Sequence, residues 1–213
     1  MKITVLGAAG NMGHRIVEEA LSRGHEVTAV VRDAARFKEI NKQAIASVGD
    51  AGNRDKVIEL STNQDLIINA TRPPNDSESE IVATTQNLLE GLAQTGVRVL
   101  MVGGAASLTV PGTGGRTVIE DPNYLPVSAR KIARGSFSQL DVCRSESRVD
   151  WVYLSPPAQL SPGTRTGNFR LGRDELLVDE QGVSKISMED LAVALMDEAE
   201  HPRHHRTRFT AAY

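Results

Sequence analysis

Short apolar stretches alternate with amphipathic stretches along most of the chain. Lys2 to Leu6 reads as a buried strand, because Ile3, Val5 and Leu6 supply β-branched and apolar bulk. The next segment predicts a helix to about Arg23 with one apolar face, and Gly24 follows it as a typical helix terminator. The same reading predicts strands at His25 to Val31, Ala44 to Val48, Asp65 to Ala70, Val97 to Val102, Trp151 to Leu154 and Arg208 to Ala212, and helices at Asn53 to Leu60, Ser79 to Thr95, Ser128 to about Arg144 and Ser187 to about Glu200.

This alternation predicts an α/β fold. Near-continuous apolar strands between helices favour a mostly parallel, doubly wound sheet of the Rossmann-like type, with helices on both faces. We expect residues 1–213 to form a single domain of this Rossmann-like type, in which residues 155–186 make an irregular section on the ligand side of the sheet. Ligands of such sheets bind beyond the carboxyl ends of the strands, near the point where strand order reverses.

The junction between the first strand and the first helix is rich in glycine, with the sequence Gly7-Ala8-Ala9-Gly10-Asn11-Met12-Gly13. Glycines at such a turn let the backbone approach a pyrophosphate, and the helix start offers free N–H groups to the anion. A tight turn with no ligand is the alternative, but the strand–turn–helix–strand context favours a dinucleotide site. The predicted binding residues of this turn are Gly7, Ala9, Gly10, Asn11, Met12 and Gly13.

Residues after the next three strands suit the rest of a dinucleotide. Arg32 follows the second strand and can pair with a 2′-phosphate, which favours NADP over NAD; the alternative is an exposed surface arginine. Asp33 either takes a ribose hydroxyl or caps a helix from Ala34. Asp50 suits the adenine amino group or a simple turn. Three residues after the fourth strand are expected near the middle of the cofactor: Ala70, Thr71 and Arg72, of which Arg72 meets the pyrophosphate or is merely exposed.

Composition and charge limit the kinds of partner that the chain is expected to have. The chain has 213 residues, a formal net charge of −3 and one cysteine. This charge gives no case for nucleic acid, and no apolar run is long enough for a membrane span. We expect a cytoplasmic protein that acts on a small molecule as a monomer or weak homodimer. His201, His204 and His205 lie in a Pro/Arg-rich connection, which we interpret as a solvated turn rather than a metal site.

Several motifs together resemble the atypical short-chain dehydrogenase/reductase superfamily. They are the glycine turn, Val31-Arg32-Asp33, Val48-Gly49-Asp50, Val102-Gly103-Gly104-Ala105-Ala106-Ser107 and Leu154-Ser155-Pro156-Pro157. Residues 162–167, 171–179 and 186–192 are similar to the tail of the NADH-flavin reductase branch, which also holds relatives of biliverdin reductase B. The resemblance covers essentially the whole chain.

The chain departs from the wider superfamily in one respect. Many members use Tyr-x-x-x-Lys as acid and base, but here Tyr124 and Lys131 are seven residues apart, and Tyr153 has no lysine four residues on. Biliverdin-reductase-B-like members also lack that pair and pass hydride directly to a flat conjugated acceptor.

The resemblance therefore implies an NADPH-dependent reductase of flavins, quinones or similar acceptors, with flavin as substrate rather than prosthetic group. It assigns Ser107 as the catalytic serine, with an ordinary loop serine as the alternative. It also makes Gly103 a cofactor-binding residue and places Pro156 beside the nicotinamide. Three residues are candidates to cover the substrate mouth, with a solvated surface as the alternative for each: Arg165, Phe169 and Arg170. A non-catalytic NAD(P) sensor of the NmrA type is the main alternative function, and an epimerase or dehydratase is disfavoured by the missing Tyr/Lys pair.

Overall fold

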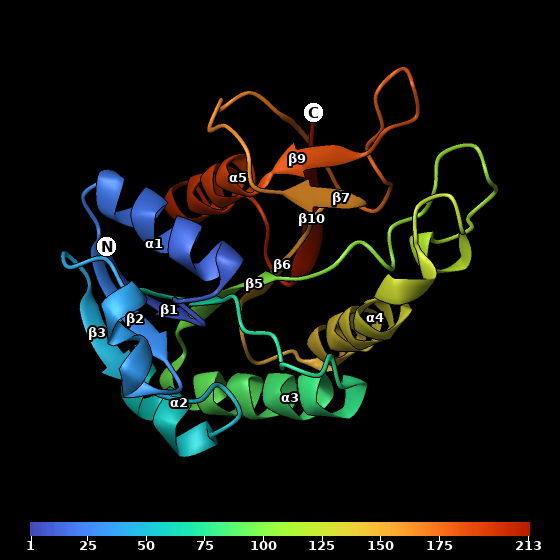
Figure 1. Cartoon of the computed structure of the whole chain (residues 1–213). Coiled ribbons are helices and arrows are strands. Elements are labelled where there is room, and N and C mark those ends of the chain that lie inside the picture. The colour runs from blue at the N-terminus through green and yellow to red at the C-terminus, as the bar shows by residue number, and fades with distance from the viewer.

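The computed structural model describes residues 1–213 and is built around one eight-stranded sheet (Figure 1). The strand order is β3-β2-β1-β4-β5-β6-β10-β8. All neighbours pair in parallel except β10 and β8, which are antiparallel. The bounds are β1 Lys2–Leu6, β2 Glu26–Val31, β3 Ile45–Val48, β4 Leu66–Asn69, β5 Arg98–Val102, β6 Trp151–Ser155, β8 Arg170–Gly172 and β10 Thr207–Ala212.

The sheet is doubly wound, as the alternation of strands and helices predicts. The chain steps outward from β1 to β2 and β3, and then returns to place β4 on the other side of β1. Strand order therefore reverses between β1 and β4. The glycine turn leaves β1 at this reversal, where sheets of this type bind their ligands.

Helices cover both faces of the sheet (Figure 1). The helices α1 (Asn11–Ser22) and α5 (Met188–Glu200) pack together on one face. The helices α2 (Arg54–Ser61), α3 (Glu78–Thr95) and α4 (Arg130–Ser145) pack side by side on the other. Three short 3₁₀ turns, η1 (Ala34–Glu39), η2 (Val118–Glu120) and η3 (Val127–Ala129), lie in the connections.

Each face of the sheet has its own hydrophobic core. Alternate residues of a strand point to opposite faces, so Val5 packs with α1 and α5, whereas Leu6 packs with α2, α3 and α4. A third, small cluster of Leu108, Val110, Val118 and Leu176 joins the long β5–α4 connection to the segment after β8.

The helix ends follow local capping rules. The side chains of Asn53, Ser77 and Ser187 accept hydrogen bonds from backbone N–H groups at the start of α2, α3 and α5. The predicted end of α3 is confirmed at Gly96, which has a φ of 71°. α1 differs, because its first residue follows Gly10 and no side chain caps it.

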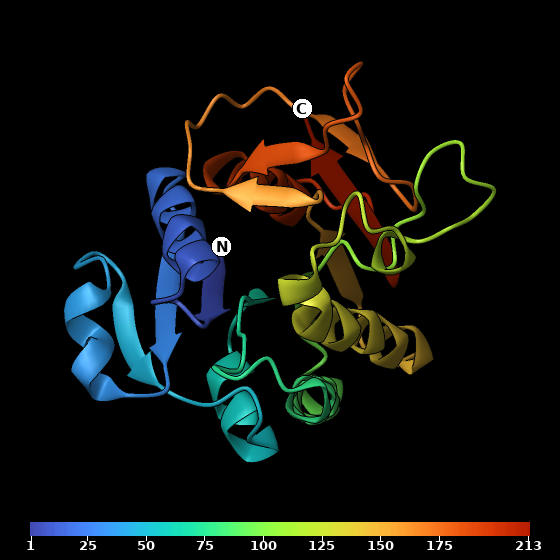
Figure 2. The ribbon, with the colours of Figure 1, turned by 45° about the vertical axis from the view of Figure 1, so that its right-hand side comes forward.

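Residues 155–186 are more regular than the sequence predicts. They hold β8 and a strand β7 (Gln159–Ser161), which pairs in parallel with β9 (Lys185–Ser187) in a separate two-stranded sheet. Figure 2 shows this small sheet beside α5. The strands are three residues long, and a pattern of apolar alternation cannot be detected over so short a stretch.

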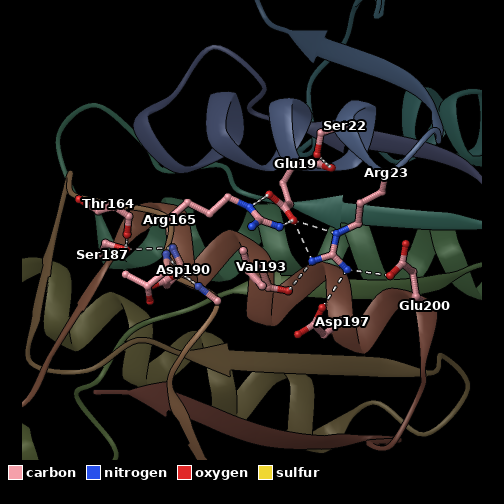
Figure 3. A network of polar contacts seen from close by, with 12 residues as sticks. Glu19, Ser22, Arg23, Thr164, Arg165, Ser187, Asp190, Val193, Asp197 and Glu200 are labelled. Carbon is pink, nitrogen blue, oxygen red and sulfur yellow. Dashed lines mark hydrogen bonds and ion pairs between the residues drawn. The ribbon is translucent and has the colours of Figure 1, made fainter.

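A network of charges fixes the loop between β7 and β8 against α1 and α5 (Figure 3). The carboxylate of Glu19 on α1 accepts hydrogen bonds from Arg23 and from Arg165 in the loop. The hydrogen bond from Arg165 lowers the pKa of Glu19 despite its burial. Asp190 on α5 accepts hydrogen bonds from the backbone N–H groups of Thr166 and Gly167 and from the Thr166 hydroxyl. The loop is therefore held from two helices.

Asp190→Asn should destabilise the protein. Burial acts to raise the pKa of Asp190, but hydrogen bonds from Thr166, Gly167 and Tyr213 outweigh it, so the pKa lies below its ordinary value. The stabilisation is therefore present above the unfolded pKa of about 3.9 and is lost as the pH falls through the lower folded value. We expect a loss of about 1.5–3 kcal/mol of unfolding free energy at pH 7, on the scale of hydrogen bonds to a charged group.

Urea unfolding at pH 7 and at lower pH measures this effect. The difference in unfolding free energy between the variant and the wild type should shrink as the pH falls below about 4, where the carboxyl of the unfolded wild type takes up a proton. It should be smallest below the lower pKa of the folded protein. Asp141→Asn is the matched control, because Asp141 is exposed on α4 and should change little. If the loss of unfolding free energy in Asp190→Asn were the same at every pH, the charge of Asp190 would not be its cause.

Candidate functional site

A cavity of about 1010 Å³ lies at the carboxyl ends of the central strands. Its lining comes from the residues that follow β1, β2, β3, β4, β5 and β6, and from parts of α3 and α4. This is the edge at which strand order reverses, so the fold brings distant segments of the chain to one site.

The glycine turn closes tightly on itself and on β4. Gly7 has a φ of +80°, and a Cβ placed on it would lie 2.8 Å from the carbonyl oxygen of Ala70. A Cβ on Gly13 would lie 2.1 Å from the carbonyl oxygen of Gly7. Both positions therefore require glycine, one for the backbone conformation and the other for the approach of α1 to the turn.

The start of α1 presents free hydrogen-bond donors. The backbone N–H groups of Ala9, Asn11, Met12 and Gly13 have no acceptor within the chain, and the first turn carries no acidic residue. These amides and the positive end of the helix dipole suit a phosphate group. Together with the glycine turn, these amides fit the pyrophosphate of a dinucleotide.

Two arginines line the cavity beyond the end of β2. Arg32 is exposed and forms no ion pair. Arg36, on η1, donates from Nη2 to the carbonyl oxygen of Ala9 at 2.8 Å and also pairs with Glu39. Asp33 caps η1 by accepting a hydrogen bond from the N–H of Ala35 at 2.9 Å, which confirms the capping alternative for this residue.

Arg36 is a candidate that the sequence analysis missed. It lies four residues after Arg32, and the cap at Asp33 predicted a helical turn from Ala34. The signal that could have found it was its place in the first turn after Asp33, a few residues beyond the strand end that carries Arg32.

The residues after β3 and β4 are also at the cavity, but internal contacts occupy part of their polar groups. One carboxylate oxygen of Asp50 accepts a hydrogen bond from the N–H of Gly52 at 2.8 Å, so the predicted turn role is present. Thr71 donates its hydroxyl to Asn69 at 2.7 Å. Arg72 forms a bidentate pair with Asp76, which lowers the pKa of that carboxyl.

Tyr153 shapes the end of β5 instead of facing the cavity. A Cβ on Gly103 would lie 2.0 Å from its ring. Its hydroxyl accepts a hydrogen bond from the N–H of Gly104 and donates to the carbonyl oxygen of Ser136 at 2.9 Å. Burial raises the pKa of Tyr153. This phenol is therefore a structural group with no access to a ligand.

The structure places Ser107 outside the cavity lining. Its side chain is buried, and its Oγ accepts a hydrogen bond from Arg208 Nη1 at 2.7 Å. Arg208 in turn pairs with Asp174. The residues of the segment from Val102 to Ser107 that do line the cavity carry no hydroxyl; they are Val102, Gly103, Gly104, Ala105 and Ala106. The geometry therefore does not support the predicted catalytic role of Ser107.

The predicted mouth residues also lie away from the cavity lining. Arg165 pairs with Glu19, and Arg170 donates to the carbonyl oxygens of Val178 and Tyr213. Phe169 packs against the core on the α1 and α5 side. The sequence could not show this for Arg165, because its partner Glu19 lies 146 residues away along the chain.

The structure gathers nearly all predicted cofactor residues at one cavity. Gly13 is the exception, because it lies beneath the turn and supports it from behind. The predicted cofactor residues that line the cavity are Gly7, Ala9, Gly10, Asn11, Met12, Arg32, Asp50, Ala70, Thr71, Arg72, Gly103 and Pro156.

No group of three or more His, Cys, Asp and Glu side chains has the arrangement of a metal site. In the histidine-rich turn, His204 pairs with Glu198 and His205 with Asp150. No helix is both long enough and apolar enough to cross a membrane.

The chain belongs to the NAD(P)H-binding family, whose model matches residues 7–202. This match confirms the resemblance to atypical short-chain dehydrogenases/reductases, and it agrees with the free backbone N–H groups at the start of α1.

Three solved structures are similar over the whole length of the chain. A "putative epimerase" from Bacteroides thetaiotaomicron is 39% identical, with a TM-score of 0.88 over 100% of this chain and 96% of its own. A "putative exported protein" from Burkholderia pseudomallei is 36% identical, with a TM-score of 0.88 over 100% of both chains. A "putative NADH-flavin reductase" from Streptococcus pneumoniae TIGR4 is 31% identical, with a TM-score of 0.81 over 100% of this chain and 99% of its own.

Proposed function

We propose that this protein is an NADPH-dependent reductase that transfers hydride to a flat conjugated acceptor such as a flavin or a quinone. One observation carries the proposal. The glycine turn and the free amides of α1 lie at a cavity whose lining residues from Val102 onward include no free acid or base side chain. The name of the Streptococcus pneumoniae relative points in the same direction.

The residues of the first half of the chain would hold the cofactor. The free amides of Ala9, Asn11, Met12 and Gly13 would bind the pyrophosphate. The second carboxylate oxygen of Asp50 forms no hydrogen bond within the chain, so it would accept one from the adenine amino group.

Arg32 would select NADPH, with Arg36 beside it. A guanidinium pairs well with a 2′-phosphate, and Arg32 has no competing carboxylate because Asp33 is used as a cap. Pro156 follows β6 and would place its backbone beside the nicotinamide carboxamide. Thr71 and Arg72 would lie near the middle of the cofactor.

Hydride transfer of this kind places few demands on the protein. A reduced nicotinamide, when bound, supplies the hydride, and a flavin or quinone ring that accepts it takes one further proton from water. The chain then has to bind and align the acceptor and exclude competing reactions. An epimerase or dehydratase would instead need an acid/base pair, and Tyr153 and Ser107 are both unavailable for that role.

Tyr124→Phe should change turnover little. Tyr124 lines the cavity, but its hydroxyl donates to the carbonyl oxygen of Gly182 at 3.0 Å and joins two loops instead of facing a reacting atom. Steady-state oxidation of NADPH with menadione checks this expectation, with thermal unfolding to report any loss of stability. A fall of kcat by several orders of magnitude in a folded variant would restore a tyrosine acid/base mechanism.

The proposal is tested by oxidation of NADPH and NADH with a panel of acceptors that includes riboflavin and quinones. We expect turnover with at least one acceptor and a preference for NADPH. Tight binding of NADPH and NADP⁺ without turnover of any acceptor would favour the alternative, a non-catalytic sensor of the NmrA type.

We further propose a cytoplasmic protein that is a monomer or weak homodimer and has no nucleic-acid partner. The Burkholderia pseudomallei relative is named as exported, so fractionation of cells that express the tagged chain is the direct test of location. Light scattering coupled to size-exclusion chromatography measures the mass in solution.

A further inference from the structure

The charged residues that line the cavity all come from the first part of the chain. Every charged lining residue comes from the part of the chain that precedes β5, and among the lining residues from Val102 onward there is no Asp, Glu, Lys, Arg or His. The charged members are Arg32, Asp33, Arg36, Asp50, Arg72 and Glu80. We call the uncharged part, formed by lining residues from Val102 to Met188, the apolar half.

The few polar side chains of the apolar half are already hydrogen-bonded within the protein. Ser136 donates to the carbonyl oxygen of Ala133, and Tyr124 donates to that of Gly182. Gln139 bonds to Thr85 and Tyr153. A ligand in this half therefore meets mainly aliphatic and aromatic surface, such as Val118, Leu125 and Ile132.

Apart from the two arginines assigned to the cofactor, the rest of the lining offers no free cation to a phosphate in the apolar half. Arg72 is already paired with Asp76, and Glu80 on α3, which packs against α4, is itself negative. Arg165 and Arg170 are held by other partners, as described above. Three exposed cations at the start of α4 line a separate depression with the start of α3, and they are Arg130, Lys131 and Arg134.

We propose that the acceptor is an uncharged, largely apolar ring compound of the quinone or dephosphorylated flavin class, and that this protein selects against acceptors that carry a phosphate. The inference rests on the proposed function, because it concerns the acceptor side of the same cavity. A phosphate dianion brought into the apolar half would lose hydration and gain no ion pair, whereas a neutral ring would gain from burial.

Riboflavin and flavin mononucleotide are the matched probes, because they share the ring system and differ by one phosphate. Their binding to the protein saturated with NADP⁺ can be measured by quenching of flavin fluorescence, without any need for turnover. We expect riboflavin to bind at least tenfold more tightly, equivalent to about 1.4 kcal/mol. Menadione, a neutral quinone, should compete with riboflavin.

A lysine placed in the apolar half should reduce this preference. Ala129 lines the cavity at the start of α4 and is partly exposed, so Ala129→Lys should fold. It should lower the ratio of the flavin mononucleotide and riboflavin dissociation constants by roughly threefold, the scale of a partly exposed ion pair. Ile132→Lys is a second variant, one turn further along α4. Ser128→Lys is the control, because Ser128 is exposed next to Ala129 but is outside the cavity lining.

The outcomes separate this inference from the proposed function. Preferential binding of riboflavin in the absence of NADPH oxidation would support the inference and count against the reductase proposal. Equal or tighter binding of flavin mononucleotide, with or without turnover, would overturn the inference. So would failure of both flavins and menadione to bind, or equal effects of Ala129→Lys and Ser128→Lys.

Discussion

Gly13→Val should weaken NADPH binding by roughly tenfold or more, equivalent to about 1.4 kcal/mol. A Cβ at this position would lie 2.1 Å from the carbonyl oxygen of Gly7, so either α1 or the glycine turn must move. Either movement displaces the free amides at the start of α1, which the proposal assigns to the pyrophosphate. Isothermal titration calorimetry measures the affinity, and circular dichroism checks that the variant is folded.

Gly24→Ala is the control, because it should lower the stability of the protein without changing the glycine turn. Gly24 follows the other end of α1 with a φ of +80°, and nothing lies within 4 Å of a Cβ placed on it. The alanine should cost roughly 1 kcal/mol of folding free energy through backbone strain. NADPH affinity should stay unchanged. Unchanged affinity in a folded Gly13→Val variant would show that the turn does not hold the cofactor.

Arg32→Ala should weaken NADPH binding by roughly 10- to 100-fold and leave NADH binding almost unchanged. A charge-assisted, bidentate pair between a guanidinium and a phosphate contributes about 1.5–3 kcal/mol, and NADH has no 2′-phosphate to pair with. Arg32 is exposed at the cavity and forms no ion pair in the chain, so its loss should not disturb the fold. Dissociation constants for both cofactors, in wild type and variant, measure the effect.

Arg54→Ala is the matched control, because Arg54 is an exposed arginine on α2 outside the cavity lining. Arg36→Ala should also weaken NADPH, but it removes the hydrogen bond to Ala9 and so should weaken NADH to some extent. A wild type that prefers NADH, or an Arg32→Ala variant that weakens both cofactors equally, would refute the phosphate role.

The order of strands and helices could be predicted because its causes are local. β1 was predicted at its observed bounds, since a buried parallel strand is a short apolar run. The glycine turn was predicted to bind a dinucleotide because the steric demands on Gly7 and Gly13 leave a direct trace in the sequence. The doubly wound sheet follows from the same alternation.

The missed features depend on contacts between distant segments. β8 pairs antiparallel to β10, and β7 pairs with β9, over only three residues each. The sequence predicted Ser107 to be a site residue. In the structure its hydroxyl accepts a hydrogen bond from Arg208, which lies 101 residues later in the chain, and Ser107 is outside the cavity lining. Arg165 was expected at the substrate mouth, yet its partner Glu19 is on the first helix. Such pairs have no local pattern from which to predict them.

Hydride transfer by this chain is measured directly by single-turnover reduction of menadione in a stopped-flow instrument, with NADPH and with NADPH deuterated at the transferred position of C4. We expect the protein to speed NADPH oxidation, menadione to be consumed in a one-to-one ratio with NADPH, and deuteration to slow the step. NADPH that binds but is oxidised no faster than without the protein, across menadione and riboflavin, would contradict the claim that this chain is a reductase.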